Sequence, residues 1–240
     1  MDKLLSGQNI ASRSESKKLA LKGLISINGT VTRRSDCKVD PEKDVIVVKG
    51  QQVVYQKYLY IMMNKPDGVL SASHDRHAQT VIDLLPQELK RSGLFPAGRL
   101  DRNTTGLMLI TDDGELSHQM LSPKKHVYKL YEVHTDVPLQ EDIVQHFARG
   151  IVSGDDTFLP ADIRLTGSNS ALVEICEGKF HQIKRMFHAV GAQVVQLKRL
   201  RIGGLYLDKQ LHEGEFRLLR PEEVPLLTDY AFRELHNTSF

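Results

Sequence analysis

The stretch GRLDRNTTGL, residues 98–107, holds the residues whose types and spacing are best suited to chemistry. A single carboxylate, Asp101, is followed there by Asn103, Thr104 and Thr105, whose side chains can all hydrogen bond. An Asp with a Thr three residues later is also a common loop or helix-cap arrangement, so a purely structural role stays open. A carboxylate that a neighbouring cation keeps ionised could instead act as a nucleophile or a base.

The segment EGKFHQIKRMFHAVG, residues 177–191, supplies candidate cations for that carboxylate. At about 100° per residue, its pattern predicts an amphipathic helix that ends at Gly191. One face is apolar, and the opposite face carries His181, Lys184, Arg185 and His188. Two interpretations remain: a solvated surface helix, or a basic wall that faces phosphates and brings Lys184 to a carboxylate.

Other catalytic patterns fit this sequence poorly. The ten histidines are scattered, and the pair His74 and His77 has no matching set of Cys or carboxylate ligands. There is no GxSxG, no Walker A loop and no GxGxxG after a predicted strand. We therefore predict chemistry by a single carboxylate, with no metal and no other cofactor.

The composition is that of an ordinary globular protein. The 240 residues are 40% hydrophobic and 26% charged, and no apolar run approaches the ~20 residues of a membrane span. The N-terminal residues lack the apolar core of a secretory signal, and the two cysteines, Cys37 and Cys176, form no CxxC pair. These features predict a cytoplasmic protein.

Positive charge is concentrated at the N-terminal end. Residues 1–50 contain ten Lys or Arg and six Asp or Glu, whereas the rest of the chain has a slight acidic excess. A basic N-terminal part suggests contact with a polyanion, although a merely solvated helix face gives the same charge.

A compact N-terminal module should present these charges. The patterns of residues 2–5 and 12–23 predict two helices, and Ser12 and Glu15 have the spacing of a capping box at the start of the second. The Asn-Gly pair at residues 28–29 is typical of a hairpin turn between two strands, and a third strand follows a polar loop.

The body of the chain alternates predicted strands and helices at irregular spacing, which favours an α+β fold over a strict βαβ arrangement. The predicted strands lie at residues 58–65, 106–111, 128–135, 171–177 and 194–202. The predicted helices lie at residues 80–86, 114–121, 139–150 and 181–190.

Three separated stretches together resemble the signature segments of RNA pseudouridine synthases: GRLDRNTTGLMLITDDGELSH, KLYEV, and EGKFHQIKRMF with RIGGLYL downstream. NKPDGVL and TDDGELSH favour the RsuA-like branch, which modifies small-subunit ribosomal RNA. SRSESKKLALKGLISINGTVTRR resembles an S4 RNA-binding domain. The resemblance implies an S4-like domain with its linker at residues 1–56 and a catalytic domain at residues 57–240, built on a mixed, mainly antiparallel sheet.

The resemblance also assigns roles to positions of this chain. Asp101 matches the family's catalytic aspartate, and Lys184 matches the basic residue that pairs with it. Tyr131 matches the tyrosine that stacks on the uracil. Arg99 matches a residue thought to help push the target nucleotide out of its stack, and Leu200 lies where the family has an apolar pocket wall.

The implied reaction is the isomerisation of a specific uridine to pseudouridine in 16S ribosomal RNA, by base flipping and rearrangement of the glycosidic bond. The sequence leaves open whether Asp101 attacks C1′, attacks C6 or acts as a base. The loop departs from the family pattern at position 103, which is usually acidic and is Asn103 here. That departure leaves open how the loop is held.

The implied partner is ribosomal RNA, most specifically 16S rRNA in a partly assembled small subunit, bound by a monomer. Six N-terminal cations are predicted to contact phosphates: Arg13, Lys17, Lys18, Lys22, Arg33 and Arg34. On the body, predicted RNA contacts are His181 and Arg185, and the track could extend over Lys198, Arg199 and Arg201. Two alternatives remain: a synthase that acts on 23S rRNA, and a non-catalytic RNA-binding factor of ribosome assembly.

Overall fold

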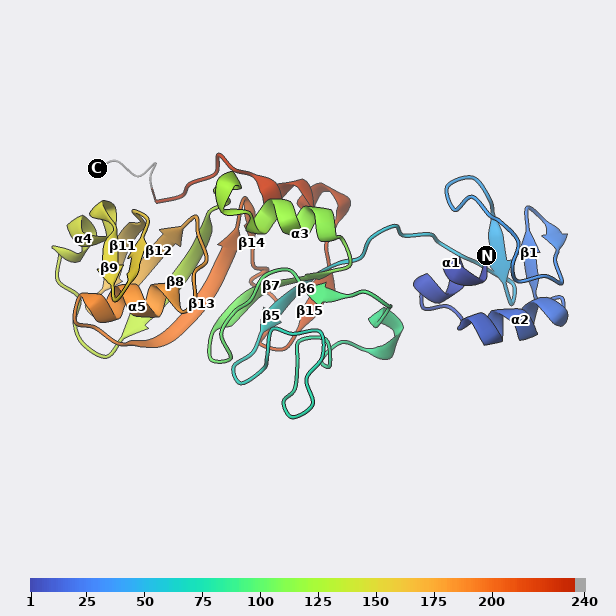
Figure 1. Cartoon of the computed structure of the whole chain (residues 1–240), viewed down its shortest axis with the longest axis horizontal. Coiled ribbons are helices and arrows are strands. Elements are labelled where there is room, and N and C mark those ends of the chain that lie inside the picture. Colours follow the sequence, from blue (N-terminus) through green and yellow to red (C-terminus); the bar gives the residue numbers. More distant parts are fainter. Residues whose placement is uncertain (236–240) are drawn as a thin grey trace. The chain divides into compact units, whose positions relative to one another are not determined.

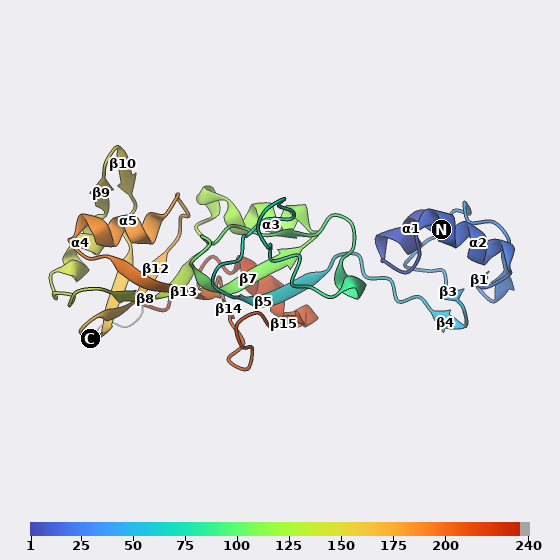
Figure 2. The same ribbon diagram turned by 90° about the horizontal axis from the view of Figure 1, so that it is seen from below.

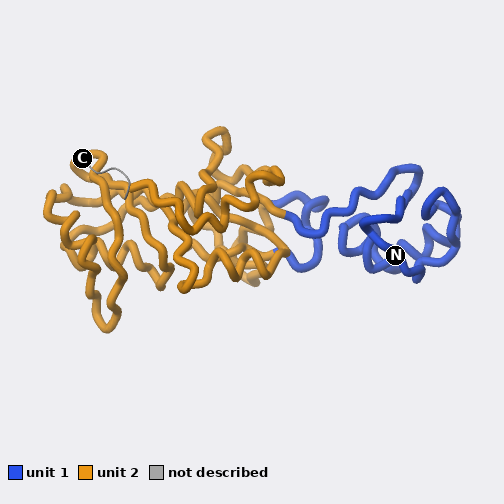
Figure 3. Tube along the Cα trace, turned by 90° about the horizontal axis from the view of Figure 1, so that it is seen from above, with its two compact units in different colours: residues 1–59, 85–94 blue, residues 60–84, 95–240 orange. Residues whose placement is uncertain are grey.

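The computed structural model describes residues 1–235, which form two units (Figures 1 and 3). The first unit takes residues 1–59 and 85–94, and the second takes residues 60–84 and the chain from Phe95 onward. The sequence predicted a single boundary after residue 56. It gave no sign that residues 85–94 belong with the N-terminal part.

The first unit contains two helices and a four-stranded sheet in the order β2-β1-β3-β4. The Ser12 hydroxyl accepts a hydrogen bond from the backbone N–H of Glu15 at 3.2 Å, which starts the second helix as predicted. Asn28 and Gly29 have positive φ and form the predicted hairpin turn. The elements are α1 (Asp2–Gly7), α2 (Arg13–Leu21), β1 (Ile25–Ile27), β2 (Thr30–Val31), β3 (Ile46–Val48), β4 (Gln51–Gln52) and the 3-10 helix η1 (Gln87–Leu89).

This unit has its own small apolar core between the helices and the sheet. Leu5 and Ala20 from the helices are fully buried and pack with Ile25 of β1 and Ile46 of β3. Because these residues come from both helices and from the sheet, the core orders α1 and α2 against the sheet.

The second unit is built on one nine-stranded sheet. Its main path runs β11-β12-β8-β13-β7-β5-β15, with β14 beside β13 and β6 beside β7. Among the sheet strands that the structure describes, only β13 and β7 pair in parallel, so the sheet is mixed and mainly antiparallel, as predicted. The strands are β5 (Tyr60–Lys65), β6 (Phe95–Pro96), β7 (Thr105–Thr111), β8 (Lys129–Thr135), β11 (Asp162–Gly167), β12 (Ser170–Ile175), β13 (Val194–Ile202), β14 (Leu205–Tyr206) and β15 (Phe216–Leu218).

Among the described residues, three helices pack on this sheet: α3 lies beside β7, α4 contacts the edge strand β11, and α5 contacts β13 (Figures 1 and 2). The helices are α3 (Gly114–Leu121), α4 (Ile143–Arg149) and α5 (Gln182–Ala189), and short 3-10 turns are η2 (Pro123–Lys125), η3 (Pro221–Glu223) and η4 (Pro225–Thr228). A hairpin of β9 (Ile151–Ser153) and β10 (Asp156–Phe158) packs on α5. Within residues 1–235, no helix is long and apolar enough to cross a membrane.

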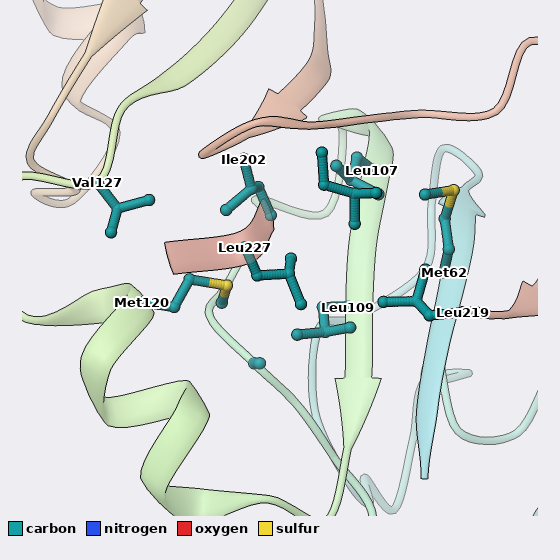
Figure 4. Close-up of a cluster of buried hydrophobic side chains, with 10 residues drawn as sticks. Met62, Leu107, Leu109, Met120, Val127, Ile202, Leu219 and Leu227 are labelled. Atoms are coloured by element: carbon teal, nitrogen blue, oxygen red, sulfur yellow. The ribbon is translucent and has the colours of Figure 1, made fainter. Parts of the chain in front are cut away.

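The main core of the second unit lies between α3 and the middle of the sheet (Figure 4). Met120 of α3 and Leu227 of η4 pack against Leu109 of β7, Met62 of β5 and Ile202 of β13. All five of these side chains are no more than 1% exposed, so the core fixes β5, β7 and β13 relative to one another.

A second group of apolar side chains fixes α5. Phe187 of α5 and Phe147 of α4 are fully buried, with ring centroids 5.1 Å apart in an edge-to-face arrangement. Ile183 and Met186 are also buried, as the helical periodicity predicted. The opposite face of α5 is left for polar contacts.

Two predicted helices differ from the structure. Residues 80–86 form turns, because the side chain of Asp83 accepts hydrogen bonds from the backbone N–H and the hydroxyl of Thr80. Thr80 also forms an isolated β-bridge with Leu70. The helix predicted for residues 139–150 begins only at Ile143; before it, the backbone N–H of Leu139 donates to the carbonyl of Ser168, and the N–H of Ile143 closes a single turn with the carbonyl of Gln140.

Candidate active site

Asp101 lies on the loop between β6 and β7, and Lys65 holds that loop in place. Lys65 ends β5 and is fully buried, and its Nζ donates to the carbonyl oxygens of Pro66, Arg102 and Thr104 at 3.0, 3.1 and 3.0 Å. Burial lowers the pKa of Lys65 to about 8. Two of the three acceptors lie one and three residues after Asp101, so this ammonium fixes the backbone that follows the carboxylate.

The segment that follows Lys65 adds further bonds to the same loop. The backbone N–H of Gly68 donates to the carbonyl of Arg102 at 3.0 Å, and Arg102 Nε donates back to the carbonyl of Gly68 at 2.9 Å. Ser71 Oγ donates to the carbonyl of Leu100 at 2.9 Å and accepts from its N–H at 3.1 Å. The loop is therefore held on both sides of Asp101.

Gly106 brings this loop against β13. Its φ is +98°, and a Cβ at this position would lie 2.3 Å from the carbonyl oxygen of Arg199. Glycine alone allows this conformation and this close approach together. The approach sets Thr105 and Gly106 in parallel register with Lys198 and Arg199, next to the strand that carries Tyr131.

The carboxylate of Asp101 meets two basic side chains from the α5 region. Lys184 Nζ lies 3.0 Å from Asp101 Oδ2, and His181 Nε2 lies 3.4 Å from Asp101 Oδ1. Lys184 also donates a hydrogen bond to the Oδ1 of Asn103. The Asp101 and Lys184 side chains are 26% and 21% exposed, so their attraction is stronger than between fully solvated charges.

The structure shows how the loop is held at position 103, where it departs from the family pattern. Asn103 serves as a neutral acceptor for Lys184, so the ammonium bridges the loop without a second negative charge. His181 reaches Asp101 because it precedes α5 in a left-handed conformation, with φ of 49°, and its ring stacks on Phe180. The sequence predicted His181 only as an RNA contact.

Asp101 opens into a pocket, all of whose lining residues belong to the second unit. Tyr131 forms one wall and is 9% exposed, and Arg99 lies at the rim as an exposed side chain. The full lining is Arg99, Leu100, Asp101, Thr104, Tyr131, Ile175, Gly178, Lys179, His181, Gln182, Ile183 and Leu197. The structure thus brings Asp101, Arg99 and Tyr131 to one pocket, with Lys184 against the carboxylate.

Leu200 is not among the residues that line this pocket, and Leu197 of the same strand is. The pairing of β13 with β8 shifts between Arg199 and Arg201, which leaves Leu200 as the extra residue of a bulge. Leu197 lies two residues from Arg199, the partner of Tyr131, and therefore shares the face of Tyr131.

Several predicted RNA contacts on the body have other partners. Arg185 pairs with Asp156 of the β9–β10 hairpin at 2.6 Å, and it lowers the pKa of that carboxyl. Arg199 and Arg201 were expected on the surface track but are 4% and 0% exposed. Arg201 is bound to Glu174 of β12, because this end of β13 lies inside the sheet.

The predicted N-terminal cations are all exposed. Arg13, Lys17, Lys18 and Lys22 lie on or beside α2, and Arg33 and Arg34 follow β2. Arg34 pairs with Asp36 at 3.0 Å, and this pair lowers the pKa of the Asp36 carboxyl.

Lys65 was not singled out as a site residue in the sequence, although it lies in a recognisable motif. Lys65 lies in NKPDGVL, a segment that supported the family resemblance without a role for the lysine. Leu197 gave no comparable signal, since single apolar residues in strands are common. Among residues 1–235, no three His, Cys, Asp or Glu side chains gather closely enough to hold a metal ion.

Comparison with known proteins agrees with this geometry. Residues 59–189 match the model of the RNA pseudouridylate synthase family. A Bacillus subtilis protein described as an uncharacterized RNA pseudouridine synthase is 42% identical over 95% of this chain and 98% of its own length. The ribosomal small subunit pseudouridine synthases A of Vibrio cholerae and Escherichia coli are 40% and 36% identical, each over 93% of this chain and 97% of their own length.

A solved structure supports the same assignment. The crystal structure of a pseudouridylate synthase superposes with a TM-score of 0.67 at 34% identity, covering 94% of this chain and 98% of that one. The family match spans more than half of the chain and includes Asp101, Tyr131 and Lys184. The chain belongs to the RNA pseudouridylate synthase family and is an RNA pseudouridine synthase.

Proposed function

We propose that this enzyme converts one specific uridine of small-subunit (16S) ribosomal RNA to pseudouridine, acting in the cytoplasm on a partly assembled subunit. The observation that carries the chemistry is the Asp101 carboxylate, 3.0 Å from Lys184 Nζ, at a pocket lined by Tyr131. The choice of RNA is supported by full-length relatives that are named for the small ribosomal subunit.

The reaction is an isomerisation, so no atom is gained or lost overall. The N1–C1′ bond breaks, the uracil turns, and a bond forms between C5 and C1′; the C5 proton leaves to solvent, and N1 gains a proton. Asp101 supplies the carboxylate that attacks C1′, attacks C6 or removes a sugar proton. An ammonium 3.0 Å away stabilises the negative charge needed for each of these routes.

Other residues hold the nucleotide. Eversion of a base costs a few kcal/mol, which pocket contacts have to repay. Tyr131 supplies a nearly buried ring on which the detached uracil can stack. The exposed guanidinium of Arg99, at the rim, can occupy the space that the uridine leaves in the RNA.

The first unit would provide affinity as an S4-like RNA-binding domain. Its six exposed cations can contact phosphates without reading bases, because every RNA sequence has the same charged phosphates. The second unit and the shape of the RNA then determine which uridine is modified.

The proposed substrate is tested by mapping pseudouridines in ribosomal RNA from a strain that lacks the gene. We expect one site in 16S rRNA to be lost, and to return with the wild-type gene but not with Asp101→Asn. Loss of a 23S site would instead identify a large-subunit enzyme. An unchanged map of both RNAs would favour a role in ribosome assembly without catalysis.

A further inference from the structure

Two buried cations lie beside Tyr131 and are not used by the proposed reaction. Lys129 of β8 is 7% exposed and Arg199 of β13 is 4% exposed. Arg199 is the cross-strand partner of Tyr131, and Lys129 precedes Tyr131 by two residues on the same face of β8. The two positive charges therefore flank the ring that is proposed to hold the uracil.

Neither cation has a carboxylate partner among residues 1–235. Lys129 Nζ makes a long hydrogen bond, of 3.5 Å, to the carbonyl oxygen of Cys176. Arg199 Nε donates to the carbonyl of Leu107 at 2.8 Å, but its Nη2 is buried without a hydrogen-bond partner. Burial, and then the charge of Arg199, lower the pKa of Lys129 to about 8. Two like charges held together without a counter-ion are costly, and a bound anion would remove that cost.

Both side chains line a second pocket that adjoins the first. The two pockets share Arg99, Tyr131, Gly178 and Lys179. The second is lined by Gly98, Arg99, Leu121, Pro123, Lys129, Tyr131, Glu177, Gly178, Lys179 and Arg199.

The second pocket has an excess of positive charge. Its four cations face a single acid, Glu177. That carboxylate is already engaged by the backbone N–H of Leu159, by Gln182 and, at 3.8 Å, by Lys179. Lys129 and Arg199 therefore remain available for an anion that enters from solvent.

We propose that this second pocket binds a phosphodiester group of the RNA backbone next to the everted uridine, through Lys129 and Arg199. The proposal rests on the proposed function, in which the uracil occupies the adjoining pocket against Tyr131. A guanidinium and an ammonium are the side chains best suited to phosphate, and here they are already held in place by the sheet. Bound there, the phosphate keeps the ribose close to Asp101 while the uracil is detached.

The test is calorimetric binding of uridine, uridine 5′-monophosphate and uridine 3′-monophosphate to the full chain. We expect at least one nucleotide to bind about ten-fold more tightly than uridine, and Lys129→Met to abolish that preference. Met has a similar volume and no charge, so the variant should fold; its thermal unfolding is measured alongside. The matched control is Lys124→Met, which removes an exposed lysine five residues earlier and should keep the preference.

Proton uptake gives an independent measurement on the wild type. Because the pKa of Lys129 is about 8, phosphate binding near pH 8.5 should protonate the amine, and the apparent enthalpy should change with the ionisation enthalpy of the buffer. Equal affinity for uridine and both nucleotides, or an undiminished preference in Lys129→Met, would overturn the proposal. Binding requires no turnover, so failure of the proposed substrate assignment would appear separately, in the pseudouridine map.

Discussion

At the scale of single residues, two basic side chains contact the carboxylate of Asp101, and their contacts differ. Lys184 binds Asp101 and the neutral amide of Asn103, whereas His181 reaches the other oxygen of Asp101 at a longer distance. A second acid at position 103 would compete with Asp101 for the same ammonium. With asparagine there, Asp101 is the only carboxylate that Lys184 contacts within residues 1–235.

This arrangement predicts a large effect of removing the ammonium. Lys184→Met should lower kcat about 100-fold or more, because a charge aimed at the reacting group typically contributes that much. The RNA dissociation constant should change only a few-fold. The control is Lys209→Met, an exposed lysine outside both pockets, which should keep the wild-type rate. Turnover near wild type in Lys184→Met would contradict the role given to this contact.

The buried Lys65 predicts a dependence of stability on pH. Its pKa is about 8 in the folded protein and 10.5 ordinarily, so the unfolded chain binds more protons between these values. The free energy of unfolding should therefore rise with pH from about 8 to 10.5, and it should rise less in Lys65→Met. Urea unfolding of both proteins near pH 7.5 and pH 10 measures this difference.

The same substitution should also destabilise the protein at neutral pH, by about 1–3 kcal/mol, since three carbonyl groups lose their donor. Lys129 is also buried with a pKa of about 8 and remains in the variant. Part of the rise in the free energy of unfolding with pH should therefore persist. An identical rise in wild type and variant would show that Lys65 does not titrate in this range.

At the scale of elements, the site depends on how closely β7 approaches β13. Gly106→Ala would place a methyl group 2.3 Å from a backbone carbonyl of β13 at a φ of +98°. We expect a loss of stability of about 3 kcal/mol or more, or failure to fold. The matched control, Gly114→Ala at the start of α3, has no atom within 4 Å of the new methyl group and should unfold at or above the wild-type temperature. Equal stability of the two variants would contradict this account.

The elements that were predictable from sequence carry strong local signals. The amphipathic period of residues 181–190, the capping at Ser12 and the turn at residues 28–29 each depend on neighbouring residues, and all three were predicted correctly. The turn at residues 80–86 depends on hydrogen bonds from Thr80 to the Asp83 side chain and on a β-bridge to Leu70, outside the segment, and it was missed. The bulge at Leu200 likewise depends on pairing between strands, which no local pattern reveals.

Asp101, Tyr131 and Lys184 were found through family motifs, and the structure brings all three together. Arg199 was placed on the surface because its charge was considered without the sheet around it. Charge alone does not distinguish a solvated arginine from one buried between strands.

At the scale of the whole molecule, the chain combines a basic unit with a catalytic unit. If the cations of α2 contact phosphates, changing Arg13, Lys17, Lys18 and Lys22 together to Gln should weaken RNA binding and reduce its salt dependence. The slope of log Kd against log salt should fall by about 3. Filter binding of the full-length variant between 50 and 200 mM KCl, roughly the range in which such contacts dominate, measures the slope.

Lys209→Gln serves as the comparison for this experiment, because it removes an exposed lysine of the second unit outside the proposed contacts. Its slope should match that of the wild type. If the fourfold variant keeps the wild-type slope, the RNA-binding role proposed for the first unit is wrong. That result would leave the catalytic role of the second unit standing.

The central claim, that the Asp101 carboxylate carries out the isomerisation, is tested most directly by release of tritium from uridine labelled at C5 in small-subunit RNA. Wild-type protein should release one tritium per modified uridine, because the C5 proton leaves when C5 bonds to the ribose. Asp101→Asn should release none while its RNA affinity stays within a few-fold of wild type. Continued release by Asp101→Asn, at a rate near that of the wild type, would contradict the account.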